Sequence, residues 1–283
     1  MRFSILLTLF FSLPVYLFSL TSPFTDQIYY LEHVEGRGLG YHKGYTTLGA
    51  FTTFHKNTWK ALDPFMDVKI HYFNNGKMAA NAGAGVRFSS PHSWIFGAQG
   101  WYDFRQGRFG DFHQIGVGLE ALGPLFDFRV NGYFPVGNTI HHSRTHVFDS
   151  FVGDYWATCQ EIETAWRGLM IEWGLYLRKR PCNNYDLYLS AGPYYFKSHH
   201  THAEIYGGKI RLDAAYSYFN AALIGFYDQK NKGRIQLQLT VWFPWNKSSV
   251  QKKDCCQNPL IFQPMKRQEI IYLSEGCNWD WNW

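Results

Sequence analysis

The feature that most constrains the fold is an alternation of apolar and polar residues that repeats over most of the chain. Between residues 34 and 243, segments of about ten residues alternate with a period of two and are separated by turn-forming sequences. In segment 234–243, Leu237 and Leu239 fall on one face and Gln238 falls on the other. This period is that of a β-strand with one apolar and one polar face.

The pattern predicts about twelve antiparallel strands whose connections alternate between short and long. The expected strands are 34–42, 45–54, 66–74, 78–88, 94–104, 112–122, 125–136, 164–178, 185–197, 207–217, 219–228 and 233–243. Residues 136–163 form the longest expected loop. The glycines from Gly36 to Gly40 are expected to let the first strand bend. An even count with long loops at one end is typical of outer-membrane barrels.

The distribution of charge distinguishes a membrane barrel from a soluble sheet. Charged residues are only 17% of the chain, against about 25% in an average soluble domain. They concentrate on the polar face of the strands, where a lumen lined by both signs can pair them beside water. We therefore predict an all-β fold, a transmembrane antiparallel β-barrel of about twelve strands. A soluble β-sandwich with these charges on its surface is the alternative.

Two groups of residues are assigned to positions in this barrel. The residues predicted to face the lumen are Asp67, Lys69, Arg87, Asp103, Glu120, Asp127, Arg129, Glu172, Arg211, Asp213 and Arg234. The residues predicted to form aromatic girdles at the two membrane interfaces are Trp94, Tyr102, Phe104, Tyr133, Phe134, Trp173, Tyr194, Tyr195, Trp242 and Trp245.

The N-terminal residues 1–22 are predicted to be a secretory signal peptide. Arg2 supplies the positive region, and residues 5–18 supply the apolar region. An N-terminal membrane anchor is the alternative, although the apolar run is short and contains Pro14. The remaining domains are a barrel over residues 23–245 and a C-terminal tail over residues 246–283.

Four short sequences and their order carry a resemblance to a known family. They occupy residues 81–87 (NAGAGVR), 94–104 (WIFGAQGWYDF), 113–120 (HQIGVGLE) and 131–135 (NGYFP). Together with residues 185–196 and the final strand, they resemble the translocator barrel of the intimin/invasin family, the inverse autotransporters. The tail sequence PMKRQEIIYL, residues 264–273, resembles the segment that follows the barrel in that family.

The resemblance implies a twelve-stranded outer-membrane barrel with both ends in the periplasm. In the family, the chain after the barrel passes back through the pore and displays immunoglobulin-like passenger domains outside. Only 38 residues follow Trp245 here, so no large passenger is expected and the adhesin activity is not carried over. We expect the barrel to anchor the chain and to display its loops and tail. A passive, porin-like pore with a mixed-charge lumen is the alternative.

The expected partners follow from this location. They are outer-membrane lipid, periplasmic chaperones and the barrel assembly machinery, for which Phe243 and Trp245 at the end of the last strand are the predicted assembly signal. The five cysteines are an odd number, which leaves a thiol that can link to a partner chain. The scattered basic residues and a net charge of +5 give little support for a nucleic-acid partner.

The cysteines also report on the route of the tail. If the tail rises through the lumen, Cys277 comes within reach of Cys159 in the long outer loop. If it stays in the periplasm, Cys182 in an inner turn is the partner within reach. Residues 252–259 read as a linker, and residues 270–273 are the only β-forming run in the tail. The lumen route is favoured because residues 264–273 resemble the family's exit segment.

No catalytic, cofactor or metal site is predicted. His142 and Ser143 are adjacent in the long loop, but no third group orients them as a hydrolase requires. The histidines at 141, 142, 146, 199, 200 and 202 lack the cysteine or carboxylate spacing of a metal site. We therefore expect a protein that is not an enzyme.

Overall fold

The structure is a computed structural model in which most of the chain folds as β-strands. It describes residues 25–54, 62–90, 93–152, 155–178, 185–230, 232–244, 264 and 266–282. The predicted signal peptide and the whole of the predicted linker in the tail lie outside these residues. No helix in the described residues is long and apolar enough to cross a membrane.

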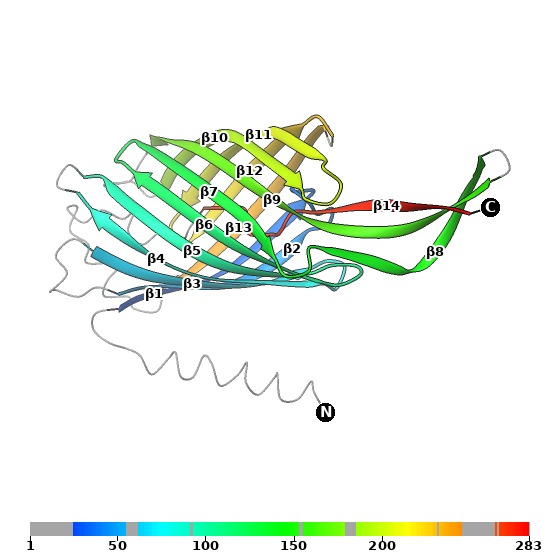
Figure 1. The fold of residues 1–283 in the computed structure, drawn as a ribbon. Helices are drawn as coiled ribbons and strands as arrows, with labels where there is room; N and C mark the ends of the chain where they lie inside the picture. Colours follow the sequence, from blue (N-terminus) through cyan, green and yellow to red (C-terminus); the bar gives the residue numbers. More distant parts are fainter. Residues whose placement is uncertain are drawn as a thin grey trace, which may run out of the picture.

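Twelve strands form a closed antiparallel barrel, as the sequence predicts (Figure 1). They are β1 (Thr25–Gly36), β2 (Tyr45–Phe54), β3 (Leu62–Phe73), β4 (Met78–Ser89), β5 (Ile95–Gln106), β6 (Asp111–Leu122), β7 (Phe126–Val136), β9 (Tyr155–Arg178), β10 (Tyr185–Ser198), β11 (Glu204–Tyr216), β12 (Phe219–Asp228) and β13 (Lys232–Pro244). The barrel closes where β13 pairs with β1, so that Pro244 lies opposite Ile28. The first and last barrel strands therefore start and finish at the same end.

The two faces of the barrel wall differ as the alternation predicts. On the outside, Leu119 is 63% exposed and Ile235 is 69% exposed. A continuous exterior of this kind would be unstable in water, whereas lipid tails accept it without cost. The polar positions between these residues point inward and are buried. The apolar band therefore marks the surface that contacts membrane lipid.

The first strand is where the predicted boundaries are wrong. A strand was expected at 34–42, but β1 covers Thr25–Gly36 and pairs with both β2 and β13. The alternation is hidden here because apolar or aromatic residues lie on both faces: Tyr30 is buried inside while Leu31 is 46% exposed outside. The run from Gly36 to Gly40 does not bend a strand: Gly36 is the last residue of β1, Gly40 lies in the turn that follows, and both have positive φ angles.

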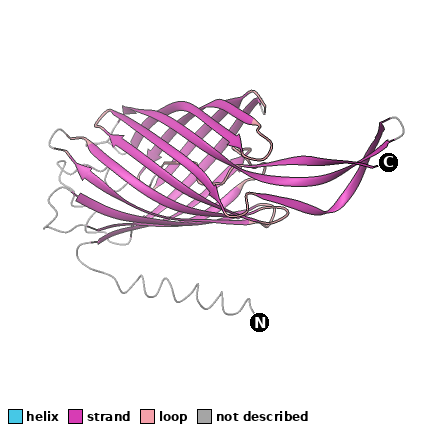
Figure 2. Cartoon of the chain, in the orientation of Figure 1, coloured by secondary structure: helices cyan, strands magenta, loops and turns pink. Residues whose placement is uncertain are grey.

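The longest predicted loop is mostly β-structure. The region 136–163 contains β8 (Ile140–Val152) and the first part of β9, which pair as an antiparallel hairpin. β9 has 24 residues and so is roughly 80 Å long, more than twice the hydrocarbon thickness of a bilayer. Its second half lies in the barrel wall between β7 and β10, and its first half projects beyond the barrel mouth (Figure 2).

The aromatic girdles are only partly as predicted. Tyr102, Phe134 and Trp173 are about half exposed on the outside. In contrast, Tyr133 and Tyr194 are 1% and 2% exposed and lie inside the barrel, in one apolar cluster with Tyr272 of the tail. Their hydroxyls are hydrogen-bonded there, which satisfies the polar end of a buried tyrosine.

Candidate functional site

The lumen is lined by charged side chains that pair with one another. All eleven residues predicted for this face are at most 9% exposed. Burying a charge without a partner is very unfavourable, so the pairing is what makes this interior possible. The pairs are Lys69 with Asp67, Arg87 with Glu120, Arg129 with Asp127, Arg211 with Asp213, Lys209 with Glu172, Arg234 with Asp228, and Arg267 with Asp103.

One of these partners, Arg267, does not belong to the barrel wall. It lies in the tail, whose residues 266–272 run through the lumen before the chain leaves the barrel (Figure 1). We call residues 264 and 266–272 the lumen segment. Its position was the favoured of the two routes considered from the sequence.

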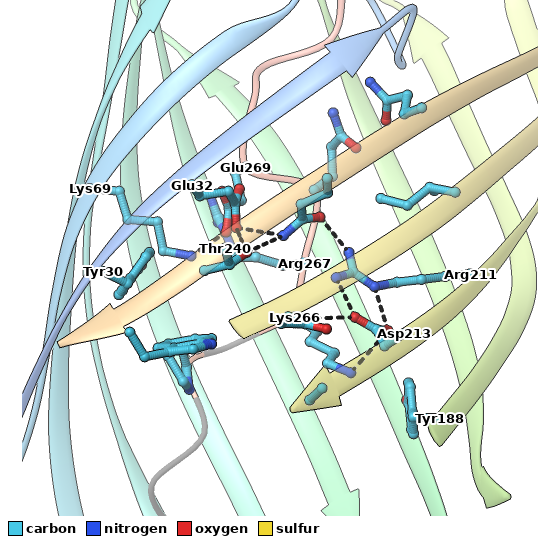
Figure 3. A pocket seen from close by; sticks show the side chains of 18 of the residues that line it. Tyr30, Glu32, Lys69, Tyr188, Arg211, Asp213, Thr240, Lys266, Arg267 and Glu269 are labelled. Atoms are coloured by element: carbon cyan, nitrogen blue, oxygen red, sulfur yellow. Dashed lines mark hydrogen bonds and ion pairs between the residues drawn. The ribbon is translucent and has the colours of Figure 1, made fainter. Parts of the chain in front are cut away.

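Charged residues of the lumen segment contact both signs of charge in the wall (Figure 3). Lys266 Nζ lies 3.4 Å from Asp213 Oδ2 and 3.6 Å from the centre of the Tyr188 ring. Arg267 pairs with Asp103 and stacks 4.4 Å from the centre of the Trp101 ring. The basic pair is therefore held by carboxylates and aromatic rings on separate sides of the barrel.

The next residues continue this contact with the wall. Glu269 pairs with Lys69, and Asn81 Nδ2 donates to the Glu269 carbonyl oxygen at 2.8 Å. The backbone N–H of Gln268 donates to Tyr133 Oη at 2.8 Å. Because the segment has irregular backbone, these wall side chains replace the hydrogen bonds that a strand would supply.

The lumen segment ends in apolar contacts. Ile270 packs in a cluster with Val34, Tyr45 and Phe73, where it is 1% exposed. Tyr272 stacks on Phe196 with ring centres 5.0 Å apart. The run at 270–273, predicted as β-forming, is therefore mainly a buried apolar anchor, and only its last residue starts a strand.

The chain leaves the lumen between a glycine and an arginine. Gly40 has φ +75°, and a Cβ on it would lie 2.6 Å from the backbone nitrogen of Leu273. Arg105 Nη1 donates to the carbonyl oxygens of both Gly40 and Ile271, at 2.8 and 2.5 Å. Gly40 is thus required for the close approach of two backbones, and Arg105 joins the wall, the turn and the exiting segment.

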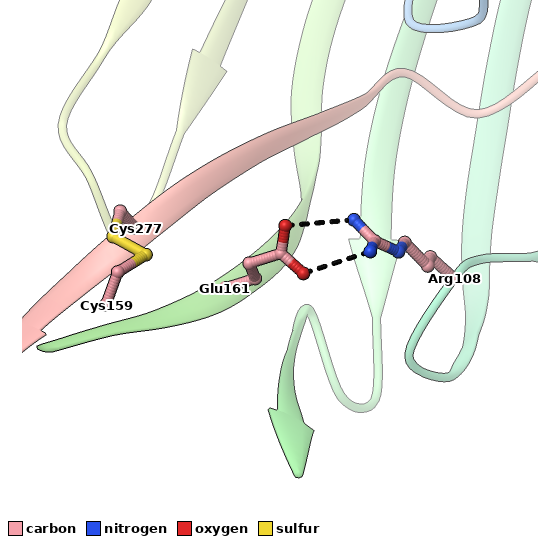
Figure 4. The surroundings of a disulfide bond; sticks show 4 residues. All are labelled: Arg108, Cys159, Glu161 and Cys277. Atoms are coloured by element: carbon pink, nitrogen blue, oxygen red, sulfur yellow. Dashed lines mark hydrogen bonds and ion pairs between the residues drawn. A yellow bond between two sulfur atoms is a disulfide. The ribbon is translucent and has the colours of Figure 1, made fainter. Parts of the chain in front are cut away.

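Beyond the barrel mouth the tail becomes a strand. β14 (Leu273–Asn282) pairs antiparallel with the projecting half of β9, on the side opposite β8. A disulfide joins Cys159 of β9 to Cys277 of β14, with a Cα–Cα distance of 5.5 Å (Figure 4). The cysteine pair named for the lumen route is therefore the one that is bonded. Cys182, Cys255 and Cys256 lie outside the described residues.

A cavity of about 350 Å³ lies beside the lumen segment, toward the end where β1 begins and β13 finishes. It is lined by paired charges such as Arg211 and Asp213, and by tyrosines including Tyr30 (Figure 3). A second cavity, of about 250 Å³, lies at the opposite mouth and is lined in part by Tyr272 and Ser274. The lumen segment borders both cavities.

Three residues of the lumen segment were not singled out from the sequence: Lys266, Arg267 and Glu269. A signal was present, because the tail sequence KRQE places two cations and one carboxylate beside an apolar run. Alternation identifies only strands, and an irregular segment leaves no such pattern. Their partners, Asp213, Asp103 and Lys69, were all predicted for the lumen.

The loop histidines that were considered for a metal site contact separate groups, and the predicted assembly signal lies elsewhere, at the end of β13. His141 contacts the Asp111 carbonyl oxygen, and His200 contacts Thr139. No group of three or more His, Cys, Asp or Glu residues suited to a metal ion occurs within the described part of the chain. Phe243 is 53% exposed on the outside of β13, and Trp245 lies outside the described residues.

Comparison with known proteins gives a family match and a fold match. A model of the inverse autotransporter β-domain matches residues 45–204, more than half of the chain. No curated protein matches the chain. A solved structure from work on the in-meso crystallization of membrane proteins is 17% identical and has a TM-score of 0.61. The alignment covers 89% of this chain and 100% of that one.

Two other barrels are more distant. The translocator domain of the autotransporter NalP from Neisseria meningitidis is 10% identical, with a TM-score of 0.40 over 86% of this chain and 96% of that one. The KdgM porin in complex with disordered oligogalacturonate is also 10% identical, with a TM-score of 0.41 over 77% of this chain and 99% of that one.

Proposed function

Because this chain belongs to the inverse autotransporter β-domain family, whose barrels lie in the outer membrane, we propose that it exports and displays its own C-terminal segment. In this proposal the barrel anchors the chain, the lumen segment fills the pore, and β14 is presented on the cell surface beside the β8–β9 hairpin. The barrel end that holds the start of β1 and the finish of β13 is periplasmic, and the hairpin is outside.

The path of the tail is the observation that carries this proposal. β13 finishes at one mouth, and β14 begins at the other. Between them, the lumen segment makes ion pairs with Asp103, Asp213 and Lys69 and packs Ile270 into an apolar cluster. Such contacts fit a segment that stays in the lumen better than a channel kept open for solutes.

The partners and the absence of catalysis belong to the same proposal. Outer-membrane lipid covers the apolar band, and periplasmic chaperones and the barrel assembly machinery deliver the chain, with Phe243 and Trp245 as their signal. The protein acts as an anchor and exporter and not as an enzyme. A cysteine outside the Cys159–Cys277 pair is available for a disulfide to a partner chain.

Single-channel conductance separates export and display from a passive pore. The full chain in a planar bilayer should pass little current, because the lumen segment occupies the pore. A variant ending at Trp245 should open a stable conductance once its folding has been verified by heat-modifiable gel migration. Equal conductance with and without the tail would favour the porin-like alternative and contradict a role for the lumen segment as a plug.

A further inference from the structure

The cavity at the mouth that carries the β8–β9 hairpin differs in charge from the rest of the lumen. We call this cavity of about 250 Å³ the exit cavity, because the tail leaves the barrel there. Five basic side chains and two carboxylates line it. The basic residues are Lys43, Lys77, Arg105, Lys230 and Arg234, and the acidic residues are Glu163 and Glu275.

The excess of positive charge is not neutralised by ion pairs. Deeper in the lumen, cations such as Arg87 and Arg129 each have a carboxylate within 3 Å. Within the described part of the chain, Lys43, Lys77, Arg105 and Lys230 have no carboxylate within ion-pair distance. A cavity with low-dielectric walls and one excess sign of charge concentrates ions of the opposite sign.

The two carboxylates do not remove this excess. Glu163 Oε2 accepts the backbone N–H groups of Arg108 and Phe109, at 2.5 and 3.3 Å. Glu275 lies on the exposed part of β14. One carboxylate is therefore committed to the loop between β5 and β6, and the other is solvated.

Two buried guanidinium groups line this cavity, and each has a buried N–H without a hydrogen-bond partner. Arg105 is 8% exposed; its Nη1 is occupied by two carbonyl oxygens, while its Nε has no hydrogen-bond partner. Arg234 is 9% exposed, and its Nε also has no partner although it pairs with Asp228. A buried N–H without a hydrogen bond is unfavourable. Guanidinium groups match the oxygens of carboxylates and phosphates in geometry and charge.

We propose that the exit cavity binds a small multivalent oxyanion of the phosphate class. Arg105 and Arg234 supply buried positive charge beside it, and Lys43 and Lys230 approach it from the exposed rim. A water molecule occupies about 30 Å³ in the liquid, so the cavity has room for a phosphate group with a short organic part. Since Tyr272, Leu273 and Ser274 form part of the lining, the site is complete only when the tail is in place.

Calorimetric titration of the purified full chain in zwitterionic detergent with inorganic phosphate tests this site. Ionic strength is held constant with sodium chloride. The main variant combines Lys43→Gln and Lys230→Gln, two exposed residues without ion pairs, so folding should be retained. We expect phosphate affinity to fall at least about tenfold, as loss of charge-assisted hydrogen bonds predicts. The control, Lys197→Gln, removes a cation outside the exit cavity and should leave the affinity unchanged.

A second titration identifies the source of the phosphate group. The same proteins in lipid nanodiscs are exposed to lipopolysaccharide with phosphorylated or dephosphorylated lipid A. Binding of inorganic phosphate that the double variant weakens supports a soluble ligand. Binding only of the phosphorylated lipid, again weakened by the double variant, supports a lipid headgroup. Absence of binding, or equal binding by wild type and double variant in both titrations, would overturn the proposal.

Discussion

At the scale of single residues, Gly40 sets how closely the exiting tail can approach the wall. We expect Gly40→Ala to displace the tail, because its Cβ would lie 2.6 Å from the Leu273 nitrogen. Gly137→Ala is a matched control, since Gly137 has φ +72° but no neighbouring atom within 4 Å of a built Cβ. The fraction of chains with the Cys159–Cys277 disulfide, measured on non-reducing gels, should fall only for Gly40→Ala. An equal effect of both variants would point to backbone strain alone.

The pair between Arg267 and Asp103 is the most buried charge contact of the tail. Both residues are at most 1% exposed by side chain, so Arg267→Gln should cost about 3 kcal/mol of unfolding free energy by leaving a buried carboxylate unpaired. Asp103→Asn should cost a similar amount, and the double variant less than the sum. Denaturant unfolding of the four proteins measures the coupling.

The exposed pair between Arg108 and Glu161 provides the comparison. Its side chains are 49% and 40% exposed, so Arg108→Gln should change the unfolding free energy by less than about 1 kcal/mol. If Arg267→Gln is as mild as Arg108→Gln, or if the two lumen substitutions are additive, the lumen segment is not held by this ion pair.

At the scale of elements, the register of β13 decides which side chains meet lipid. Leu237 is 47% exposed on the outside, whereas Gln238 donates to Glu32 inside the barrel. Leu237→Arg should cost about 2–4 kcal/mol near the bilayer midplane and reduce the folded fraction. Gln238→Arg places the cation in the lumen, between Glu32 and Arg211, and should assemble better than Leu237→Arg because it does not meet lipid. Heat-modifiable gel migration in isolated outer membranes measures both, and equal assembly would contradict this register.

The barrel strands were predictable because lipid and lumen impose opposite chemistry on neighbouring residues. β2 and β12 have the predicted boundaries, since the alternation is strong in both strands. The bounds of β1 were not predicted, because Tyr30 fills the lumen side while Leu31 faces lipid, so both faces are apolar or aromatic. The hairpin of β8 and β9 was not predicted, because it lies outside the membrane, where no lipid face imposes a regular alternation.

At the scale of the whole molecule, the tail fills the lumen of the barrel and joins the projecting half of β9 outside it. The predicted lumen charges form most of the candidate site, but their partners Lys266, Arg267 and Glu269 lie on irregular backbone that has no period to detect. The cysteines were a better guide, because the lumen route makes one pairing available. Beyond the mouth, β9 links the hairpin, β14 and the barrel wall in a single strand.

The most direct test of the account is whether Cys277 reaches the cell surface. In a variant that keeps Cys277 and replaces the other four cysteines by serine, a membrane-impermeant thiol reagent is applied to intact cells. A variant that keeps only Cys159 reports on the hairpin in the same way. We expect both cysteines to be labelled without permeabilisation of the outer membrane. Labelling of Cys277 only after permeabilisation, with Cys159 labelled on intact cells, would place the tail in the periplasm and contradict the account.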